Sequence, residues 1–242
     1  MIVASSLDEE IYFTIKQAIV SRDLAPGTKL SEEVLANLLK VSRTPIRSAL
    51  RRLSYERLVT IVPFKGAFVS KPTVKEVQDV FEMRILLEEH AIEKAFSNLQ
   101  QPQNVELLEE LLLQERRAYG DKNFDTILQR VRDFHIQIAQ LSGNEILLNS
   151  LEELISLTNI YITFFSQINM ASPDSPEEHR EILQAIKHGD IDSAKGKMRA
   201  HINASLKRLN FDLIRNSSAS MEEILYRSFQ SHMGTSEETV LE

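Results

Sequence analysis

The chain has 242 residues, of which 43% are hydrophobic and 26% are charged, an ordinary composition for a soluble globular protein with a real core. It contains no cysteine, which excludes disulfides, thiolate metal sites and a cysteine nucleophile, and which agrees with a reducing compartment. Its apolar runs are too short to cross a bilayer and its first residues do not resemble a signal peptide, so we expect a cytoplasmic protein without membrane contact.

The net charge of −7 is unevenly distributed along the chain. Residues 1–72 carry 11 Lys and Arg against 7 Asp and Glu, whereas residues 73–242 carry 17 against 28. The segment 40–71 alone has eight basic residues and a single acid, Glu56. A basic patch on an acidic chain is typical of a surface that meets the phosphate backbone of nucleic acid, although a solvated basic helix face would have the same composition.

Three helices and a β-hairpin are predicted in the first 72 residues. Apolar residues at helical spacing indicate helices over 6–22, 32–40 and 43–57. Pro45 falls in the first turn of the third helix, where its missing N–H has no intrahelical partner. Residues 59–62 and 67–70 are β-prone and flank a turn at 63–66. This order of elements predicts a winged helix-turn-helix.

The rest of the chain, after the boundary at Lys71-Pro72-Thr73, is predicted to be helical. The expected helices span 73–97, 104–119, 123–141, 144–169, 176–188 and 190–216, with a weaker helix at 220–231. Residues able to cap helices stand at Ser31, Asn144, Ser175 and Asp190. The fold class is therefore mainly α, with a winged helix-turn-helix domain at 1–72 and an all-α bundle of six to seven helices at 73–242 that ends in a partly disordered tail.

Several segments resemble one family of bacterial regulators. The run VSRTPIRSALRRLSYERLV, from Val41 to Val59, is similar to the recognition-helix signature of the GntR regulators. The segments FEMRILLEEHAIEKA (from Phe81), FHIQIAQLSGN (from Phe134) and HREILQAIKHGDIDSAKGKMRAHI (from His179) resemble the FCD effector domain of the FadR branch. This resemblance, over about residues 6–215, implies a homodimer with paired DNA-binding heads and a helical bundle that senses a small ligand.

The start of the predicted helix 43–57 carries the candidate DNA contacts. A helix fits the major groove, and side chains at its N-terminal end reach base edges and phosphates. The candidates are Ser42, Arg43, Thr44 and Arg47, with Arg51 one turn further along the same face and Lys65 and Gly66 at the tip of the wing. Arginine can bind guanine or phosphate with two hydrogen bonds, and the resemblance places Arg43 and Arg47 among the DNA contacts.

Two positions of this domain depart from the family pattern. Lys40 stands where the turn between the two helices usually has glycine, so we expect either slight strain or a different turn. Glu33 stands where some FadR-like heads have an arginine that reads DNA, so the operator sequence of such relatives cannot be transferred.

Three of the six histidines, His135, His179 and His201, lie on apolar stripes of three separate predicted helices. A single histidine there would be a core residue, but three that converge suggest a site for Zn²⁺, Ni²⁺ or a similar ion. The resemblance also implies that these histidines bind a divalent metal, together with an aspartate one turn before the first. That position is Val131, and Asp133 faces roughly the other way. A three-histidine site completed by water or an effector carboxylate and a metal-free pocket both remain open.

Arg84 is a cation on an apolar stripe and therefore needs a partner. Glu88, four residues on, would supply a structural pair, whereas the resemblance matches an arginine that faces the cavity and clamps an effector carboxylate. Asn159 and Tyr161 are further candidates for effector binding.

The sequence thus predicts a transcription regulator that is not an enzyme, a repressor that binds operator DNA as a homodimer and responds to a small carboxylate. A metal-dependent hydrolase is one alternative, because an open metal position could activate water. Against it, no carboxylate base is apparent near the histidines and no Ser-His-Asp, P-loop or HExxH pattern occurs. In a second alternative, the helical domain serves only for dimerisation and the histidines are core residues.

Overall fold

The computed structural model describes residues 7–166, 174–213 and 225, and the chain divides into two compact units. One unit is Met1–Pro72 with Ile214–Glu242, and the other is Thr73–Leu213. The predicted helix at 220–231 and the C-terminal tail lie outside the described residues, apart from Leu225, which is helical and buried.

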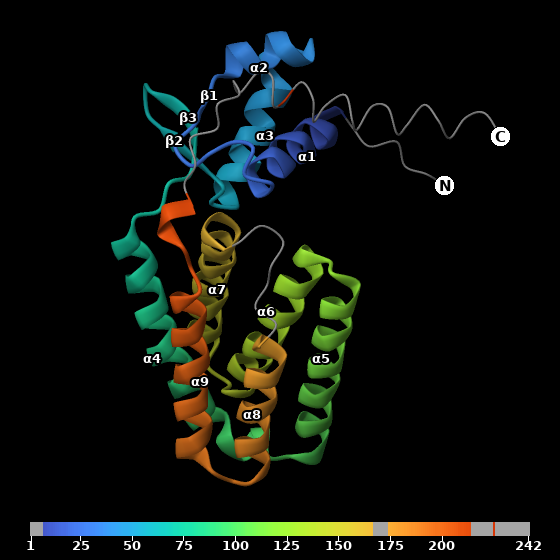
Figure 1. The fold of residues 1–242 in the computed structure, drawn as a ribbon, viewed down its shortest axis with the longest axis vertical. Helices are drawn as coiled ribbons and strands as arrows, with labels where there is room; N and C mark the ends of the chain where they lie inside the picture. Colours follow the sequence, from blue (N-terminus) through green and yellow to red (C-terminus); the bar gives the residue numbers. More distant parts are fainter. Residues whose placement is uncertain (1–6, 167–173, 214–224, 226–242) are drawn as a thin grey trace, which may run out of the picture. The chain divides into compact units, whose positions relative to one another are not determined.

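The first unit is the predicted winged helix-turn-helix (Figure 1). Its helices are α1 (Leu7–Val20), α2 (Glu32–Leu39) and α3 (Arg43–Tyr55). Its strands are β1 (Lys29–Leu30), β2 (Val59–Val62) and β3 (Gly66–Val69), in an antiparallel sheet of order β1-β3-β2. Helix α3 packs against α1 and α2 through an apolar face that includes Ile46, Leu50 and Leu53, so the opposite face of α3 is left to solvent.

The turn between α2 and α3 keeps the geometry that normally takes glycine. Lys40 adopts φ 54° and ψ 40°, in the left-handed region, and is one of the non-glycine residues there. The N–H of Val41 donates to the carbonyl of Ala36 at 3.0 Å, and the N–H of Lys40 donates to the carbonyl of Asn37 at 3.4 Å. These two bonds satisfy the last carbonyls of α2 in a Schellman motif. Lys40 therefore carries the strain that the sequence suggested, and the turn itself is unchanged.

The second unit is an all-α bundle with six helices in its described part. They are α4 (Val74–Leu99), α5 (Pro102–Asp121), α6 (Phe124–Leu141), α7 (Glu145–Phe165), α8 (Ser175–Lys187) and α9 (Ile191–Lys207), followed by a 3₁₀ turn at Phe211–Leu213. Figure 1 shows these helices running alongside one another. Helix α4 packs against α6, α7 and α9, while α8 packs against α5 and α9. Within the described residues, no helix has the length and apolar character to cross a membrane.

Side-chain caps fix most of the helix starts that the sequence indicated. Asn144 accepts a hydrogen bond from the N–H of Leu147 at 3.1 Å, and Asp190 accepts one from the N–H of Ser193 at 2.9 Å. The predicted cap at Ser175 was wrong, because α8 begins at Ser175 itself after the N-cap residue Asp174. The Ser175 hydroxyl instead donates to a buried glutamate of α5.

Two predicted helices run past their observed ends. The helix predicted at 190–216 corresponds to α9, which ends at Lys207. Beyond it, the N–H of Asn210 donates to the carbonyl of Phe165 at 2.8 Å, a bond to the end of α7 that the helical pattern cannot reveal. Helix α7 likewise ends at Phe165, because Ser166 is extended; residues 167–169, also predicted as helix, lie outside the described residues.

Candidate functional site

The N-terminal half of α3 presents the five DNA-contact candidates of this helix to solvent. Ser42 is the N-cap residue of α3, and no side-chain cap bond of its hydroxyl to the helix is formed. The exposed residues are Ser42, Arg43, Thr44, Arg47 and Arg51. The structure therefore brings these side chains together on one accessible helix end, as contact with a groove requires.

Two glutamates from the first turn of α2 hold the arginines in place. Arg47 donates to Glu32 from Nε and Nη2, with Nη2 2.7 Å from Oε2. Arg43 Nη2 lies 3.2 Å from Oε2 of Glu33, the residue that departs from the family pattern. Exposed pairs of this kind are screened by water and contribute little stability, so a phosphate or a base edge can displace the glutamates.

The wing is the turn that joins β2 to β3. The N–H of Lys65 donates to the carbonyl of Val62 at 3.1 Å, and the Lys65 side chain is exposed. Gly66 has φ 99°, and a Cβ added to it would meet nothing within 4 Å. Glycine is therefore favoured at this position by the backbone angle and not by a crowded space.

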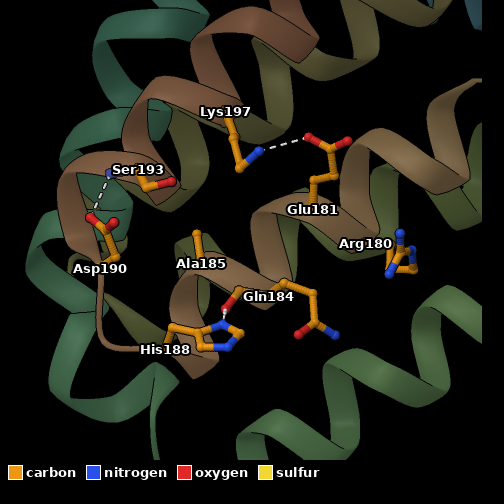
Figure 2. Close-up of a pocket in the computed structure, with 8 residues that line it drawn as sticks. All are labelled: Arg180, Glu181, Gln184, Ala185, His188, Asp190, Ser193 and Lys197. Carbon is orange, nitrogen blue, oxygen red and sulfur yellow. Dashed lines mark hydrogen bonds and ion pairs between the residues drawn. The ribbon is translucent and has the colours of Figure 1, made fainter.

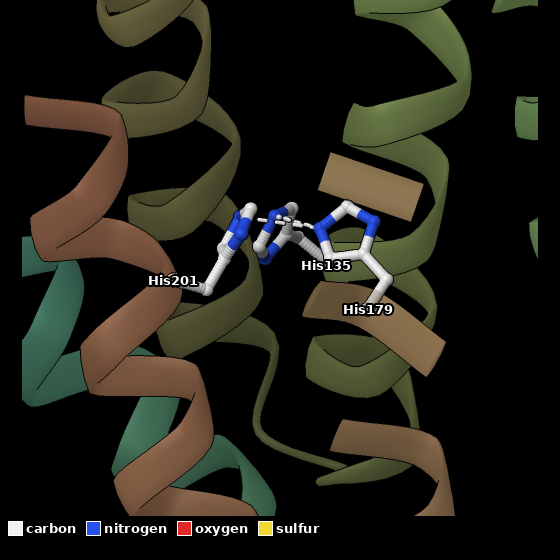
Figure 3. A group of neighbouring side chains, drawn as sticks. All are labelled: His135, His179 and His201. Atoms are coloured by element: carbon white, nitrogen blue, oxygen red, sulfur yellow. Dashed lines mark hydrogen bonds between the residues drawn. The ribbon is translucent and has the colours of Figure 1, made fainter. Parts of the chain in front are cut away.

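Three imidazoles meet inside the second unit. His135 of α6, His179 of α8 and His201 of α9 point toward one another, as Figure 3 shows. The Nε2 atom of His179 lies 3.2 Å from Nε2 of His135 and 3.1 Å from Nε2 of His201. All three side chains are buried. We call these residues the histidine triad.

A glutamate stands behind each ring of the triad and accepts a hydrogen bond from its Nδ1 atom. This finding corrects the expectation that no carboxylate lies near the histidines. The three glutamates come from α4, α5 and α8. The pairs are Glu88 with His135, Glu115 with His179 (2.7 Å) and Glu178 with His201 (2.7 Å).

Each glutamate is itself fixed by a further partner. Arg84 donates from Nε and Nη2 to Oε1 of Glu88, at 2.9 and 2.6 Å. The Ser175 hydroxyl donates to Oε1 of Glu115 at 3.1 Å, which is the role that replaces its predicted cap. Arg208 donates to both oxygens of Glu178. The ring orientations in the triad are therefore set by a second layer of hydrogen bonds.

Neighbouring charges keep two of these carboxyl groups ionised despite their burial. Burial opposes ionisation of Glu88, but the Arg84 guanidinium and the His135 ring hold its pKa at about 2. Burial also opposes ionisation of Glu178, and hydrogen bonds from its imidazole and guanidinium partners hold its pKa at about 2. Both groups are carboxylates at neutral pH and can only accept hydrogen bonds.

Burial keeps two rings of the triad, those of His135 and His201, neutral. It lowers the pKa of His135, and together with the neighbouring His179 ring it lowers the pKa of His201 to about 3. A neutral ring that donates its Nδ1–H to a carboxylate has a lone pair on Nε2. The glutamates thus direct the Nε2 lone pairs of the triad at one another.

The Nε2 atom of His179 lies 3.1–3.2 Å from the Nε2 atoms of the other two rings, and lone pairs on nitrogens this close repel unless a cation or a proton lies between them. A tetrahedral ion with metal–nitrogen bonds of about 2.0–2.1 Å separates two of its nitrogen ligands by about 3.3 Å. The spacing of the triad agrees with that value, and imidazole is a preferred ligand of Zn²⁺ and Ni²⁺. The residues present therefore fit a divalent metal ion.

The position of the aspartate ligand implied by the family is apolar. Val131 lies on α6, one turn before His135, and is half-buried. Asp133 pairs with Arg130 at 2.8 Å and accepts a hydrogen bond from Gln129 at 2.7 Å, so its carboxylate is engaged along its own helix. The carboxylates closest to the triad are therefore the glutamates bonded to Nδ1 of each ring, and no aspartate lies on the Nε2 side at position 131.

The candidate effector residues lie on helices that pack together. Arg84 is 4% exposed and forms the pair with Glu88 that the sequence allowed as its structural role. Asn159 and Tyr161 lie on α7, which packs against α4 and α6; Tyr161 is buried and Asn159 half-buried. The binding of an effector by these residues stays a prediction.

A surface hollow of about 340 Å³ lies between α8 and α9 (Figure 2). Its charged groups are already paired with their neighbours. Lys197 Nζ lies 2.7 Å from Oε2 of Glu181, and Arg180 pairs with Glu177 outside the hollow. His188 Nδ1 lies 2.7 Å from the carbonyl of Gln184, which caps the end of α8. This hollow is a solvated surface feature, and the triad remains the candidate site.

Sequence reasoning named Glu88 only as a partner of Arg84 and missed Glu115 and Glu178, although a signal was present for Glu115. Glu115 falls on the stripe that also buries Leu108 and Leu112, and a buried acid on an apolar stripe needs a partner. Glu178 directly precedes His179, but its partner His201 lies 23 residues further along, so only the packing of α8 on α9 reveals the contact.

Comparison with known proteins confirms the two domain types that the sequence and the fold indicate. Residues 7–69 match the family described as "Bacterial regulatory proteins, gntR family", and residues 79–204 match the FCD domain. The Nta operon transcriptional regulator of Aminobacter aminovorans is 30% identical over 199 residues, which cover 82% of this chain and 91% of that protein. The chain belongs to the GntR family. Its FCD domain assigns it to the FadR-like subfamily.

Other relatives of this GntR protein agree with the assignment. The HTH-type transcriptional repressor RspR of Escherichia coli is 26% identical over 197 residues, covering 81% of this chain and 86% of that one. The fold is similar to the structure of Lar, which controls the agr system of Listeria monocytogenes, with a TM-score of 0.65, 19% identity and coverage of 85% and 97%. The GntR chain is therefore a DNA-binding transcription regulator and not an enzyme, which rules out the hydrolase alternative.

Acid should destabilise the helical bundle of this GntR-family protein after dialysis against a chelator. An unfolded histidine takes up a proton near pH 6.5, whereas the folded His201, with a pKa of about 3, does not. The unfolded state then binds more protons, so stability is complete above pH 6.5 and is lost as the pH falls toward 3. We expect the free energy of unfolding to fall by about 2 kcal/mol for this ring between pH 7 and pH 5.

Amide exchange of α6, α8 and α9 in the full-length chain, after dialysis against a chelator, measures this loss. His201→Asn should flatten the pH dependence, whereas His188→Asn, at an exposed ring, should leave it unchanged. Equal protection at pH 5 and pH 7 in the unmodified protein would contradict the neutral triad.

Proposed function

We propose that this regulator is a repressor whose affinity for operator DNA is controlled by a small carboxylate effector, bound at a divalent metal on the histidine triad. The observation behind the proposal is the convergence of three buried Nε2 atoms, which are placed to bind one cation. The regulator acts in the cytoplasm as a homodimer.

The DNA-binding step uses the exposed end of α3. Arg43 and Arg47 bind guanine edges or phosphates, while Ser42, Thr44 and Arg51 bind the backbone nearby. Lys65 and Gly66 place the wing against a second part of the backbone. Two heads related by a two-fold axis read a pseudo-palindrome whose half-site spacing follows from the dimer.

The effector-binding step uses the triad. His135, His179 and His201 hold Zn²⁺ or Ni²⁺ through Nε2, and the bound ion supplies a Lewis-acidic position for an effector oxygen. Val131 offers no ligand atom where the family resemblance implies an aspartate, which leaves that position for a carboxylate. The three glutamates keep the rings in the orientation that this binding needs.

Formal charge favours an anionic effector. The ionised Glu88 and Glu178 are already paired with Arg84 and Arg208, and Arg208 also lies 3.7 Å from Asp174. A divalent ion adds positive charge to these paired groups, and an effector carboxylate offsets that charge. We assign Arg84, Asn159 and Tyr161 to the recognition of that effector.

Helix α4 couples the two steps through the chain. It carries Arg84 and Glu88 in the network around the triad, and it begins directly after Pro72, where the DNA-binding unit ends. A capping box between Thr73 and Glu76 fixes its first turn, so a shift of α4 is transmitted to the linker. An effector that prefers one arrangement of the paired heads changes operator affinity by its differential binding.

Substitution of the recognition arginines tests the DNA-binding step. Arg43→Ala and Arg47→Ala should each weaken binding of a duplex selected from a random pool by about tenfold, since each removes a bidentate contact worth about 1–3 kcal/mol. Gel-shift titration measures the affinity, and circular dichroism confirms unchanged helicity. Arg52→Ala is the matched control, because that guanidinium lies over the Tyr12 ring and pairs with Glu9. Wild-type affinity of both α3 variants would disprove the assignment.

Substitutions at the triad test the metal. His179→Ala should abolish binding of one equivalent of Zn²⁺, whereas Val131→Asp should raise the affinity about tenfold or more because it adds an anionic ligand one turn before His135. Competition with a chromogenic chelator measures both, and His188→Ala should have no effect.

The same variants separate the effector role from the dimerisation alternative. Monocarboxylates should raise the melting temperature of the zinc-loaded protein, and His179→Ala should remove that shift. If His179→Ala keeps a full equivalent of zinc, the metal lies elsewhere; if no carboxylate shifts the melting of the unmodified protein, the bundle serves for dimerisation.

A further inference from the structure

The tip of the wing carries an aromatic ring that the fold does not use. Phe64 lies between Pro63 and Lys65, and its relative exposure of 110% is the highest among the large hydrophobic side chains in the described part of the chain. The strands on either side pair through Val62 and Gly66, in a register that does not involve the ring. Burial in the core therefore does not account for a phenylalanine here.

The backbone at Phe64 is also unfavourable for a bulky side chain. Its φ is 62°, and the N–H of Lys65 donates to the carbonyl of Val62 at 3.1 Å across the turn. With Pro63 at the second position and a positive φ at the third, the arrangement is that of a type II turn, which favours glycine or asparagine at the third position. A strained, exposed aromatic residue points to a role outside the fold.

The neighbours of Phe64 identify what the ring meets. Lys65 is an exposed cation beside it, which attracts the phosphate backbone, and Gly66 lets the wing approach closely. A phenyl ring gains nothing from phosphate. Its apolar partners on a duplex are the deoxyribose faces and base steps that line the minor groove, where apolar side chains of other proteins insert as wedges.

We propose that Phe64 is an apolar wedge that enters the minor groove of the operator beside the segment contacted by α3. This inference rests on the proposed function, because α3 must first place the head on the duplex. The wedge adds affinity by burying its ring, and it favours base steps that unstack easily, at a position that α3 does not touch.

The test uses full-length protein and a duplex selected with the unmodified chain from a random pool. Phe64→Asn and Phe64→Gly both remove the ring and suit the left-handed backbone, so their melting temperatures should equal or exceed that of the parent. Both should bind the duplex about tenfold or more weakly, whereas Phe64→Trp should stay within about threefold. Because no ionic contact is lost, the slope of log affinity against log salt should not change.

Lys65→Ala is the matched control at the adjacent position. It removes a phosphate contact, so the magnitude of its salt slope should fall by about 0.9. A 2-aminopurine placed at the step that faces the wing should brighten when the parent protein binds, and should brighten less with Phe64→Gly, because unstacking relieves its quenching.

Three results would overturn the wedge. Affinities of both ringless variants within about twofold of the parent, while Arg43→Ala weakens binding, would remove the wedge and leave the proposed function intact. If Arg43→Ala, Arg47→Ala and Phe64→Gly all bind the duplex as tightly as the parent, both the wedge and the proposed DNA-binding surface are wrong. A change in the oligomeric state of DNA-free Phe64→Gly in light scattering would make the ring a protein contact.

Discussion

The second unit depends on one constraint, which is that three imidazole lone pairs are directed at a common point. Each ring is turned by a carboxylate behind it, and burial keeps the His135 and His201 rings neutral. Repulsion between the Nε2 atoms would favour rotation of the rings, yet the hydrogen bonds of Glu88, Glu115 and Glu178 oppose it. A network built in this way offers three nitrogen ligands to a cation without an aspartate ligand, and it brings α4, α5, α6, α8 and α9 into one polar core.

Under the proposed function, the same network is the part of the bundle that responds to a ligand. Arg84 and Glu88 reach the triad from α4, and α4 continues from the linker of the DNA-binding unit. Packed cores change between discrete arrangements more readily than they deform, so a small shift at the triad can move a whole helix. In the DNA-binding unit, by contrast, Arg43 and Arg47 of α3 pair with glutamates of α2 at exposed positions and can be transferred to DNA.

Local chemistry made much of the fold predictable from the sequence. The caps at Asn144 and Asp190 and the apolar periodicity placed the helix starts within a few residues. Strand β1 was missed, because two residues form a strand only through pairing with β3, which lies far along the chain. The end of α9 was missed for a similar reason, since the bond from Asn210 to Phe165 is a tertiary contact. The triad could be predicted because its histidines interrupt apolar stripes, whereas their glutamate partners come from other helices.

Anomalous diffraction from crystals of the full-length protein, purified without chelator, tests the central claim most directly. Data collected on both sides of the zinc or nickel absorption edge should show a single peak about 2.0–2.1 Å from Nε2 of each ring of the triad, with the three glutamates still accepting hydrogen bonds from Nδ1. A crystal without anomalous density at that point, in which Nε2 of His179 still lies 3.1–3.2 Å from Nε2 of the other two rings, would contradict the account.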